Sequence, residues 1–360
     1  MFMAVPRKNG IKLNKYDEEL KKFLDKQKAN IKIVGSGGAG NNTITRMMQV
    51  GVEGVESIAM NTDAQDLLYS DADKKLLIGR EITGGLGAGG DPKVGNEAAK
   101  ESRDDIKKMI EGSDMVFITC GLGGGTGTGS APVIAETAKK MNILTIAVVT
   151  LPFTMEGKLR MRNAREGLDE LRKVVDTIII IPNDKLLEIV PDVSLATAFK
   201  VADEILVNSV KGIAELVTKA GLINLDLADV KSVMTNGGLA MIGMGESDTE
   251  NRGIEAVEKA LSNPLLSLDI EGAEGALINV TGGPDITIRE AQQVVEAVSG
   301  RLNEDAKIIW GAQVNKDLAD TVRVLVVVTG VKGSEEIIEE RLLKPKKTFV
   351  EEELGIEFIE

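Results

Sequence analysis

The chain of 360 residues contains no histidine and only one cysteine, Cys120. The absence of histidine excludes a Ser-His-Asp triad, an imidazole base and a histidine-ligated metal. A single cysteine excludes an internal disulfide bond and a multi-cysteine zinc site, and we interpret Cys120 as a small buried residue. Any catalysis must therefore use carboxylates, lysine or arginine side chains, backbone N–H groups or a hard cation such as Mg²⁺.

Aromatic residues are also scarce, at 3% of the chain, so the 43% of apolar residues predict a mainly aliphatic core. Acidic residues outnumber basic ones by 56 to 43, which gives a formal net charge of −13. This charge argues against nucleic acid as the main partner and against direct binding to anionic lipid. No apolar run approaches the roughly 20 residues that cross a bilayer, and the N-terminal segment lacks the apolar core of a signal peptide. We therefore expect a soluble, cytoplasmic protein that does not insert directly into membranes.

The first half of the chain alternates short β-branched runs with helical segments, which is typical of a doubly wound α/β domain. The runs are continuously apolar, as expected for strands buried on both faces of a mostly parallel sheet. The predicted strands are residues 31–34, 55–60, 76–78, 115–119, 143–150 and 177–181. Helices are predicted at residues 94–110 and 130–141.

A long helical pattern at residues 195–220, which Gly221 would end, predicts a helix of about 39 Å that joins two domains. Further strands are expected near residues 239–244, 275–280, 307–310 and 321–329, and helices near residues 249–262 and 287–300. Fewer helices per strand indicate a smaller α+β domain with one exposed sheet face. The predicted fold class is therefore α/β: a doubly wound domain, a long central helix and a smaller α+β domain.

Glycine is concentrated in three loops, each of which we place after a strand: residues 35–42, 84–92 and 121–129. The first loop, before a helix expected near Asn42, matches a dinucleotide-binding fingerprint, but a tight turn alone would also explain it. The second loop, taken alone, is better explained as a flexible surface loop. The third precedes a helix with Pro132 in its first turn, and its glycines are suited to an anion-binding nest. No Gly-Lys-Ser/Thr follows any of them, so this is not a P-loop NTPase.

The third loop, Gly-Gly-Gly-Thr-Gly-Thr-Gly at residues 123–129, resembles the glycine-rich signature of the tubulin/FtsZ superfamily. Its threonine form, followed by Ser-Ala-Pro at residues 130–132, is more similar to the FtsZ branch, and the match suggests an archaeal-type cell-division GTPase. Further similarity lies at residues 35–42, 61–65, 152–157, 181–186 and 224–230, and it covers roughly residues 31–331. The resemblance implies a tubulin/FtsZ-like fold, and GTP hydrolysis to GDP coupled to head-to-tail assembly of a homopolymer.

Residue by residue, the resemblance implies a nucleotide site. The residues that would hold the phosphates are Gly38, Ala39, Gly40, Asn41, Asn42, Gly123, Gly124, Gly125, Thr126 and Gly127, with Ala88, Gly89 and Gly90 near the γ-phosphate. Glu156 and Arg160 would contact the ribose and phosphate side. Asn183 and Asp203 would bind guanine, and Phe199 would stack on it. By pattern alone, Phe199 is equally well explained as a core residue and Asp203 as a solvated helix-face acid. No side chain is assigned as a metal ligand, and Mg²⁺ is expected on the phosphates.

Asp226 and Asp229 are spaced three residues apart at the expected start of a helix, where both would suit capping. The resemblance implies instead that they polarise a water aimed at the γ-phosphate held by the neighbouring subunit, with Asn224 in the same loop. Both interpretations can hold together. In the implied organisation, residues 1–30 form an N-terminal extension with a short helix and residues 31–194 the GTP-binding domain. Residues 195–221 form the connecting helix, 222–332 the C-terminal domain and 333–360 an acidic tail.

Three functional hypotheses follow. The first is a filament-forming GTPase at the division site, whose tail at residues 354–358 would dock a membrane-anchoring adaptor; a frayed acidic end explains that tail equally well. The second is a family member with another duty, such as cell shape or plasmid partition. The third is a Rossmann-type oxidoreductase, for which Asn61 and Asp63 lie where a ribose-binding acid is needed.

Overall fold

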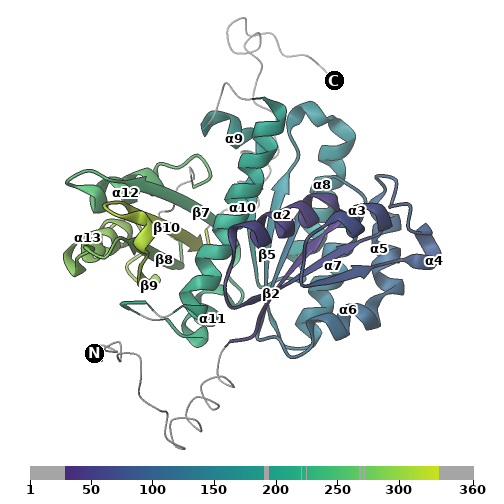
Figure 1. Cartoon of the computed structure of the whole chain (residues 1–360), viewed down its shortest axis with the longest axis horizontal. Helices are drawn as coiled ribbons and strands as arrows, with labels where there is room; N and C mark the ends of the chain where they lie inside the picture. The colour runs from purple at the N-terminus through teal and green to yellow at the C-terminus, as the bar shows by residue number, and fades with distance from the viewer. Residues whose placement is uncertain are drawn as a thin grey trace, which may run out of the picture.

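The computed structural model describes residues 29–189, 194–219, 221–223, 225–266, 270 and 273–331 (Figure 1). Three of the sequence predictions fall outside them. These are the helix in the N-terminal extension, the acidic tail with its adaptor motif, and Asn224.

Ten strands form one sheet in the order β3-β2-β1-β4-β5-β6-β7-β10-β8-β9. The strands of the first half are β1 Ile31–Ser36, β2 Val55–Asn61, β3 Lys74–Leu77, β4 Met115–Gly121, β5 Leu144–Leu151 and β6 Thr177–Pro182. Those of the second half are β7 Gly238–Ser247, β8 Gly275–Gly282, β9 Lys307–Val314 and β10 Val322–Thr329. Strands β1 to β6 pair in parallel, whereas β10 is antiparallel to both β7 and β8. All ten predicted strands are confirmed.

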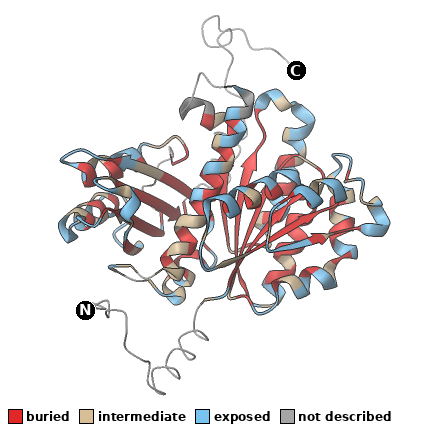
Figure 2. Cartoon of the chain, viewed as in Figure 1, coloured by how far each residue is buried: buried red, intermediate tan, exposed pale blue. Residues whose placement is uncertain are grey.

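Helices cover both faces of this sheet, and Figure 2 shows the buried strands between helices whose outer sides are exposed. The helices of the first half are α2 Gly37–Val50, α3 Ala64–Tyr69, α4 Arg80–Thr83, α5 Pro92–Glu101, α6 Arg103–Ile110, α7 Thr126–Lys140, α8 Lys158–Arg172 and α9 Asn183–Ile189. They are followed by α10 Leu195–Thr218, α11 Leu227–Met234, α12 Arg252–Leu261 and α13 Ile288–Ser299. In the part of the chain that the structure describes, no helix combines the length and apolarity needed to cross a bilayer.

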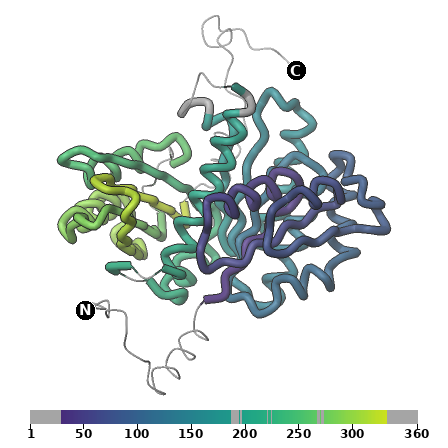
Figure 3. Tube along the Cα trace, viewed as in Figure 1, coloured from purple at the N-terminus to yellow at the C-terminus, as the bar shows by residue number. Residues whose placement is uncertain are grey.

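The long helix α10 lies between the two halves of the molecule (Figure 3). Its buried side chains share one core with Ile33 of β1 and with Leu277 and Leu325 of the C-terminal strands. The opposite face of the C-terminal strands packs on α12 and α13. The predicted exposed sheet face was therefore wrong, because α10 covers it. The two half-sheets are also joined directly, since β6 pairs in parallel with β7.

Several predicted helix boundaries were wrong for local reasons. The helix expected at residues 94–110 is two helices, because Ser102 leaves helical geometry and its hydroxyl accepts a hydrogen bond from the Gly79 N–H (2.9 Å). Helix α10 ends at Thr218 with Lys219 as its C-cap, so Gly221 does not end it. Helices α2 and α7 begin inside their glycine loops, which places Pro132 in the second turn of α7 rather than the first.

Candidate functional site

The first glycine loop is itself the start of α2. Strand β1 ends at Ser36 and the helix begins at Gly37, whose φ of +69° favours glycine. A Cβ on Gly37 would lie 2.8 Å from the Gly127 backbone nitrogen, so the first and third loops touch there. The Ser36 side chain does not cap α2; its hydroxyl lies 2.5 Å from the Ser130 hydroxyl instead. The first N–H groups of α2 are thus left without a side-chain cap.

Helix α7 follows the adjacent strand β4 through a short loop at residues 122–125, and it also lacks a side-chain cap. Its N-cap is Gly125, which has no side chain to accept a hydrogen bond. A Cβ on Gly125 would lie 2.8 Å from the Asp91 nitrogen, and one on Gly127 would lie 3.0 Å from the Ser36 oxygen. Two uncapped helix N-termini therefore lie together at the carboxyl edge of the parallel sheet. This arrangement binds anions, because helix dipoles and free N–H groups both favour negative charge.

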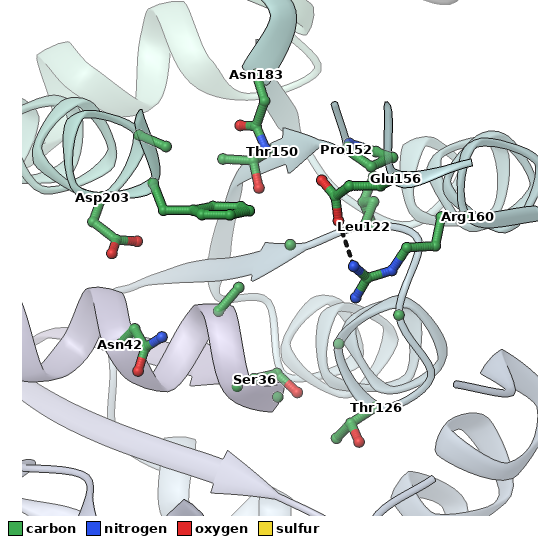
Figure 4. Close-up of a pocket in the computed structure, with 18 of the residues that line it drawn as sticks. Ser36, Asn42, Leu122, Thr126, Thr150, Pro152, Glu156, Arg160, Asn183 and Asp203 are labelled. Atoms are coloured by element: carbon green, nitrogen blue, oxygen red, sulfur yellow. Dashed lines mark hydrogen bonds and ion pairs between the residues drawn. The ribbon is translucent and has the colours of Figure 1, made fainter. Parts of the chain in front are cut away.

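A cavity of about 500 Å³ opens in front of these two helix ends (Figure 4). The predicted residues that line it are Gly38, Ala39, Asn42, Gly124, Gly125, Thr126, Gly127, Glu156, Arg160, Asn183, Phe199 and Asp203. They come from five segments that are far apart in the sequence. The sheet topology brings them together at one edge.

Three predicted residues lie behind the cavity wall rather than in it. A Cβ on Gly40 would lie 2.5 Å from the Thr119 oxygen, so glycine is needed there for α2 to pack on β4. Asn41 is buried, and in the amide orientation that satisfies its neighbours its nitrogen donates to the Gly35 oxygen (3.0 Å). The Gly123 N–H donates to the Thr128 hydroxyl (2.9 Å). These residues shape the loops that the ligand would touch.

The second glycine loop follows α4, not a strand as we predicted. Five of its glycines have positive φ: Gly84, Gly85, Gly87, Gly89 and Gly90. The loop packs on the third one, since the Ala88 Cβ lies 2.9 Å from the position of a Cβ on Gly125. The Asn163 amide also donates weakly to the Gly90 oxygen (3.4 Å). The predicted Ala88, Gly89 and Gly90 therefore lie beside the pocket, outside its lining.

The other end of the cavity carries an amide and a carboxyl group. Asn183 is 5% exposed, and its Oδ1 has no hydrogen-bond partner among the described residues. Asp203 is half-buried beside the Thr43 hydroxyl (3.5 Å), and burial raises the pKa of its carboxyl group to about 6. A buried acceptor without a donor costs free energy unless a ligand supplies one.

Phe199 lies on the same side of α10, 40% exposed, with its ring edge-on to Phe153 at a centroid distance of 5.3 Å. This exposure at the cavity wall differs from the core position that its helical pattern also allowed.

Near the cavity mouth Arg160 and Glu156 form an ion pair, drawn as a dashed line in Figure 4. Glu156 also accepts a hydrogen bond from the Phe153 N–H (2.8 Å).

Eight lining residues were not predicted: Ser36, Gly37, Gly121, Leu122, Thr150, Pro152, Ala202 and Leu206. Three of these residues could have been predicted from the sequence. Gly37 is the second glycine of the G-x-G-x-x-G pattern, and Ala202 and Leu206 follow Phe199 and Asp203 at spacings of three, which places them on one helix face. Nothing in the local sequence of Thr150, at the end of β5, indicates its place in the lining.

Asp226 and Asp229 do not line the cavity. Asp226 caps α11 by accepting from the Asp229 N–H (2.8 Å), and Asp229 accepts from the Asp226 N–H (3.2 Å). The capping interpretation is thus confirmed. Both lie beyond the C-terminal end of α10, and the 15 helical steps from Asp203 to Thr218 alone rise about 22 Å. In Figure 1, α11 lies at the opposite end of α10 from α9.

Comparison with known proteins agrees with this architecture. The GTPase-domain model of the Tubulin/FtsZ family matches residues 30–191, and the C-terminal-domain model of the FtsZ family matches residues 238–332. Cell division protein FtsZ 1 of Methanocaldococcus jannaschii is 60% identical, over 94% of this chain and 93% of that protein. The corresponding protein of Thermococcus kodakarensis is 60% identical over 90% of this chain and 87% of its own length.

Solved structures give the same result. An empty FtsZ dimer of M. jannaschii has a TM-score of 0.85 at 62% identity, covering 89% of this chain and 93% of that one. CetZ1 of Haloferax volcanii shares the fold, with a TM-score of 0.76 at 24% identity over 87% of this chain and 98% of that one. The chain therefore belongs to the tubulin/FtsZ family of GTPases, with both the GTPase domain and the FtsZ-type C-terminal domain.

Proposed function

We propose that this GTPase polymerises head to tail into the filaments of a cell-division ring, and that each subunit completes the hydrolytic site of its neighbour. Division is favoured over other filament duties because relatives that are 60% identical over most of the chain are named cell division proteins. The oxidoreductase alternative is set aside, since the chain belongs to a GTPase family and Asp63 caps α3 by accepting from the Gln65 N–H (2.9 Å).

The observation that carries the proposal is the pair of uncapped helix N-termini at one cavity. The α- and β-phosphates of GTP or GDP would lie against the N–H groups at the start of α2, at Gly38 and Ala39, and at the start of α7, at Gly124 to Gly127, with Asn42 beside them in the lining. Gly40, Asn41 and Gly123 would shape these loops from behind the cavity wall. The loop at Ala88 to Gly90 would approach the γ-phosphate. Because these donors are fixed by the fold, no reorganisation is needed when charge develops on the phosphates.

The opposite end of the cavity is suited to guanine. The Asp203 carboxylate would accept hydrogen bonds from N1–H and the 2-amino group, whereas adenine presents an acceptor at N1 and would be rejected. The unpartnered Oδ1 of Asn183 would gain a donor from the base. Phe199 would stack on the ring, and Glu156 and Arg160 would lie toward the ribose.

Mg²⁺ is proposed to bind through the phosphates. The described residues hold no group of three or more histidine, cysteine or acidic side chains that could bind a metal by themselves. The hard oxygen of Asp66 lies 3.5 Å from the position of a Cβ on Gly38, so one carboxylate is close to the phosphate loop. When bound, the ion would supply positive charge that offsets the triphosphate.

The hydrolytic acids would come from the next subunit. Each of Asp226 and Asp229 uses one carboxylate oxygen in the capping box, and the second oxygen accepts no hydrogen bond from the described part of the chain. Those oxygens, with Asn224 of the same loop, would orient the attacking water at the neighbour's γ-phosphate. A contact between opposite ends of two identical subunits does not close, and therefore gives a filament.

We also propose the domain limits given above, supported by the family matches at residues 30–191 and 238–332. The tail at residues 354–358 is proposed to bind a membrane-anchoring adaptor, which would hold the cytoplasmic filament at the division site.

The test is GTP turnover as a function of protein concentration, measured as phosphate release and light scattering with GTP and Mg²⁺. We expect the rate per subunit to be near zero in dilute protein and to rise steeply where scattering begins. ATP in place of GTP serves as the control. A rate per subunit that is the same in dilute and concentrated protein would exclude a shared site.

A further inference from the structure

The chain between α10 and the two acids is held by the edge strand of the C-terminal sheet. Ile223 forms an isolated antiparallel bridge with Ala312 of β9. The Leu222 N–H donates to the Ala312 oxygen (2.8 Å), and the Ala312 N–H donates to the Ile223 oxygen (3.3 Å). The acid-bearing loop thus takes its position from β9 as well as from α10.

Close packing reinforces this bridge. A Cβ on Gly221 would lie 2.4 Å from the Ala312 oxygen, and one on Gly311 would lie 2.8 Å from Leu216 of α10. Glycine at both positions lets the helix end, the loop and the strand approach more closely than side chains would allow.

One side chain joins all three elements. Gln313 of β9 is 8% exposed, and its Nε2 donates to the Glu215 backbone oxygen (2.9 Å) in the last turn of α10. Its Cγ also lies 3.3 Å from the position of a Cβ on Gly221. The Glu215 oxygen also accepts the last helical hydrogen bond, from the Lys219 N–H (2.9 Å). The Gln313 amide is therefore its second donor, and it fastens the end of α10 to the strand that holds the loop.

We propose that Gln313 is a positioning residue for hydrolysis: it fixes Asp226 and Asp229 relative to α10, and so to the pocket of the neighbouring subunit. The inference rests on the proposed function, because it requires the acids to act in the next subunit. The same helix lines its own pocket with Phe199 and Asp203 near its start. Gln313 contacts α10 in its last turn, far from this pocket. Loss of the Gln313 hydrogen bond should therefore alter GTP turnover and leave nucleotide binding unchanged.

The chemistry requires a hydrogen-bond donor at this position. Gln313→Glu keeps the length and volume of the side chain, but an ionised carboxylate cannot donate to the Glu215 oxygen. Gln313→Lys restores a donor of sufficient reach. Gln292→Glu is the matched control, because it makes the same change of charge on the exposed face of α13, where the Gln292 amide donates to the Glu296 carboxylate (2.8 Å).

The experiment places the acids and the nucleotide on different subunits. Asp226→Ala protein in excess, which keeps the pocket but lacks the acid, is mixed with a small amount of a donor protein and GTP. Phosphate release is then divided by the donor sedimented with the filaments. We expect Gln313→Glu donors to support about five- to tenfold less turnover than unmodified donors, the rate equivalent of one lost hydrogen bond. Gln313→Lys should recover most of that loss, and Gln292→Glu should match the unmodified donor.

The outcomes separate the two proposals. If unmodified donors fail to activate the Asp226→Ala protein, the shared site itself is wrong. If unmodified donors activate it and Gln313→Glu donors do so equally well, the positioning role is wrong. The role is also wrong if Gln313→Glu weakens GTP binding to dilute single subunits, because the side chain would then act on its own pocket.

Discussion

The polar groups near the two ends of α10 differ in whether the protein itself supplies their hydrogen-bond partners. At the N-terminal end, helices α2 and α7 lack side-chain caps and the Asn183 Oδ1 has no partner among the described residues. At the C-terminal end, the exposed Asp226 and the partly buried Asp229 satisfy one another's backbone N–H groups in a capping box. The first end is incomplete without a ligand, whereas the second is locally complete and still presents carboxylate oxygens.

This difference has a physical basis in the ligand that each end would meet. A phosphate arrives with many acceptors, so a binding site must hold donors that nothing else occupies. An acid that orients water must instead be held rigidly in the free subunit, because misplacement by about 1 Å can cost on the order of 100-fold in rate. A capping box supplies that rigidity with one oxygen of each carboxylate.

The largest expected effect separates capping from catalysis at Asp226. Asparagine is as good an N-cap as aspartate, so Asp226→Asn should keep α11 and the filament while removing the charge that polarises water. We expect GTP turnover to fall by on the order of 100-fold or more, measured as phosphate release above the assembly concentration.

In that variant, GTP affinity and filament mass should stay within about twofold of the unmodified protein. An Asp226→Asn variant that hydrolyses GTP at the normal rate would reduce Asp226 to a cap. A variant that no longer binds GTP as a dilute single subunit would show that Asp226 also affects the nucleotide pocket of its own subunit.

A smaller effect is expected at the pocket end when pH changes. Burial raises the pKa of Asp203 in the free protein to about 6, and only its ionised form accepts both guanine donors. GTP affinity should therefore be constant well above that value and fall as pH decreases through it. Between pH 7 and pH 5 the expected loss is about tenfold, measured with a fluorescent GTP analogue on dilute protein.

The phosphates of the nucleotide titrate over the same range, so Asp203→Asn supplies the baseline. This variant should bind GTP more weakly at pH 7, discriminate less against ATP, and show only the phosphate contribution to the pH dependence. Equal pH profiles for the two proteins would remove Asp203 from guanine recognition.

Much of this comparison can be predicted from the sequence, for specific reasons. The β-branched runs predicted strands β1 to β6, since continuous apolar character is required in a parallel sheet covered on both faces. The N-cap at Asp226 followed from a local preference that tertiary structure did not override. The glycine-rich loops indicated the phosphate end, because glycines are concentrated where backbone must approach backbone, as at Gly37 and Gly127.

Other features depend on contacts that no local pattern records. The break at Ser102 follows from a hydrogen bond to Gly79, more than 20 residues away. Helix α7 begins inside its glycine loop because the chain turns there against Asp91 and Ala88. The contact between Gln313 and Glu215 depends on how β9 lies against α10, and the coverage of both half-sheets by α10 depends on the pairing of β6 with β7.

The smallest expected effects concern stability, and they should have opposite signs at the two ends. Asp226→Ala removes an N-cap, so the free energy of unfolding should fall by about 1 kcal/mol.

Asp203 should have the opposite effect on stability, because its pKa in the folded protein is above the unfolded value of 3.8. A raised carboxyl pKa means that the folded state binds the proton more tightly, so this group's favourable contribution is lost as pH rises through about 6. At pH 7 the ionised, half-buried carboxylate therefore disfavours folding, and Asp203→Asn should increase the free energy of unfolding by about 1 kcal/mol, after allowance for its partial exposure. Urea unfolding of the nucleotide-free protein at pH 7 and pH 5 measures both, and the gain from Asp203→Asn should shrink at pH 5. If both substitutions destabilised the protein equally, Asp203 would be an ordinary structural acid, and the contrast between a ligand-dependent end and a self-sufficient end would not hold.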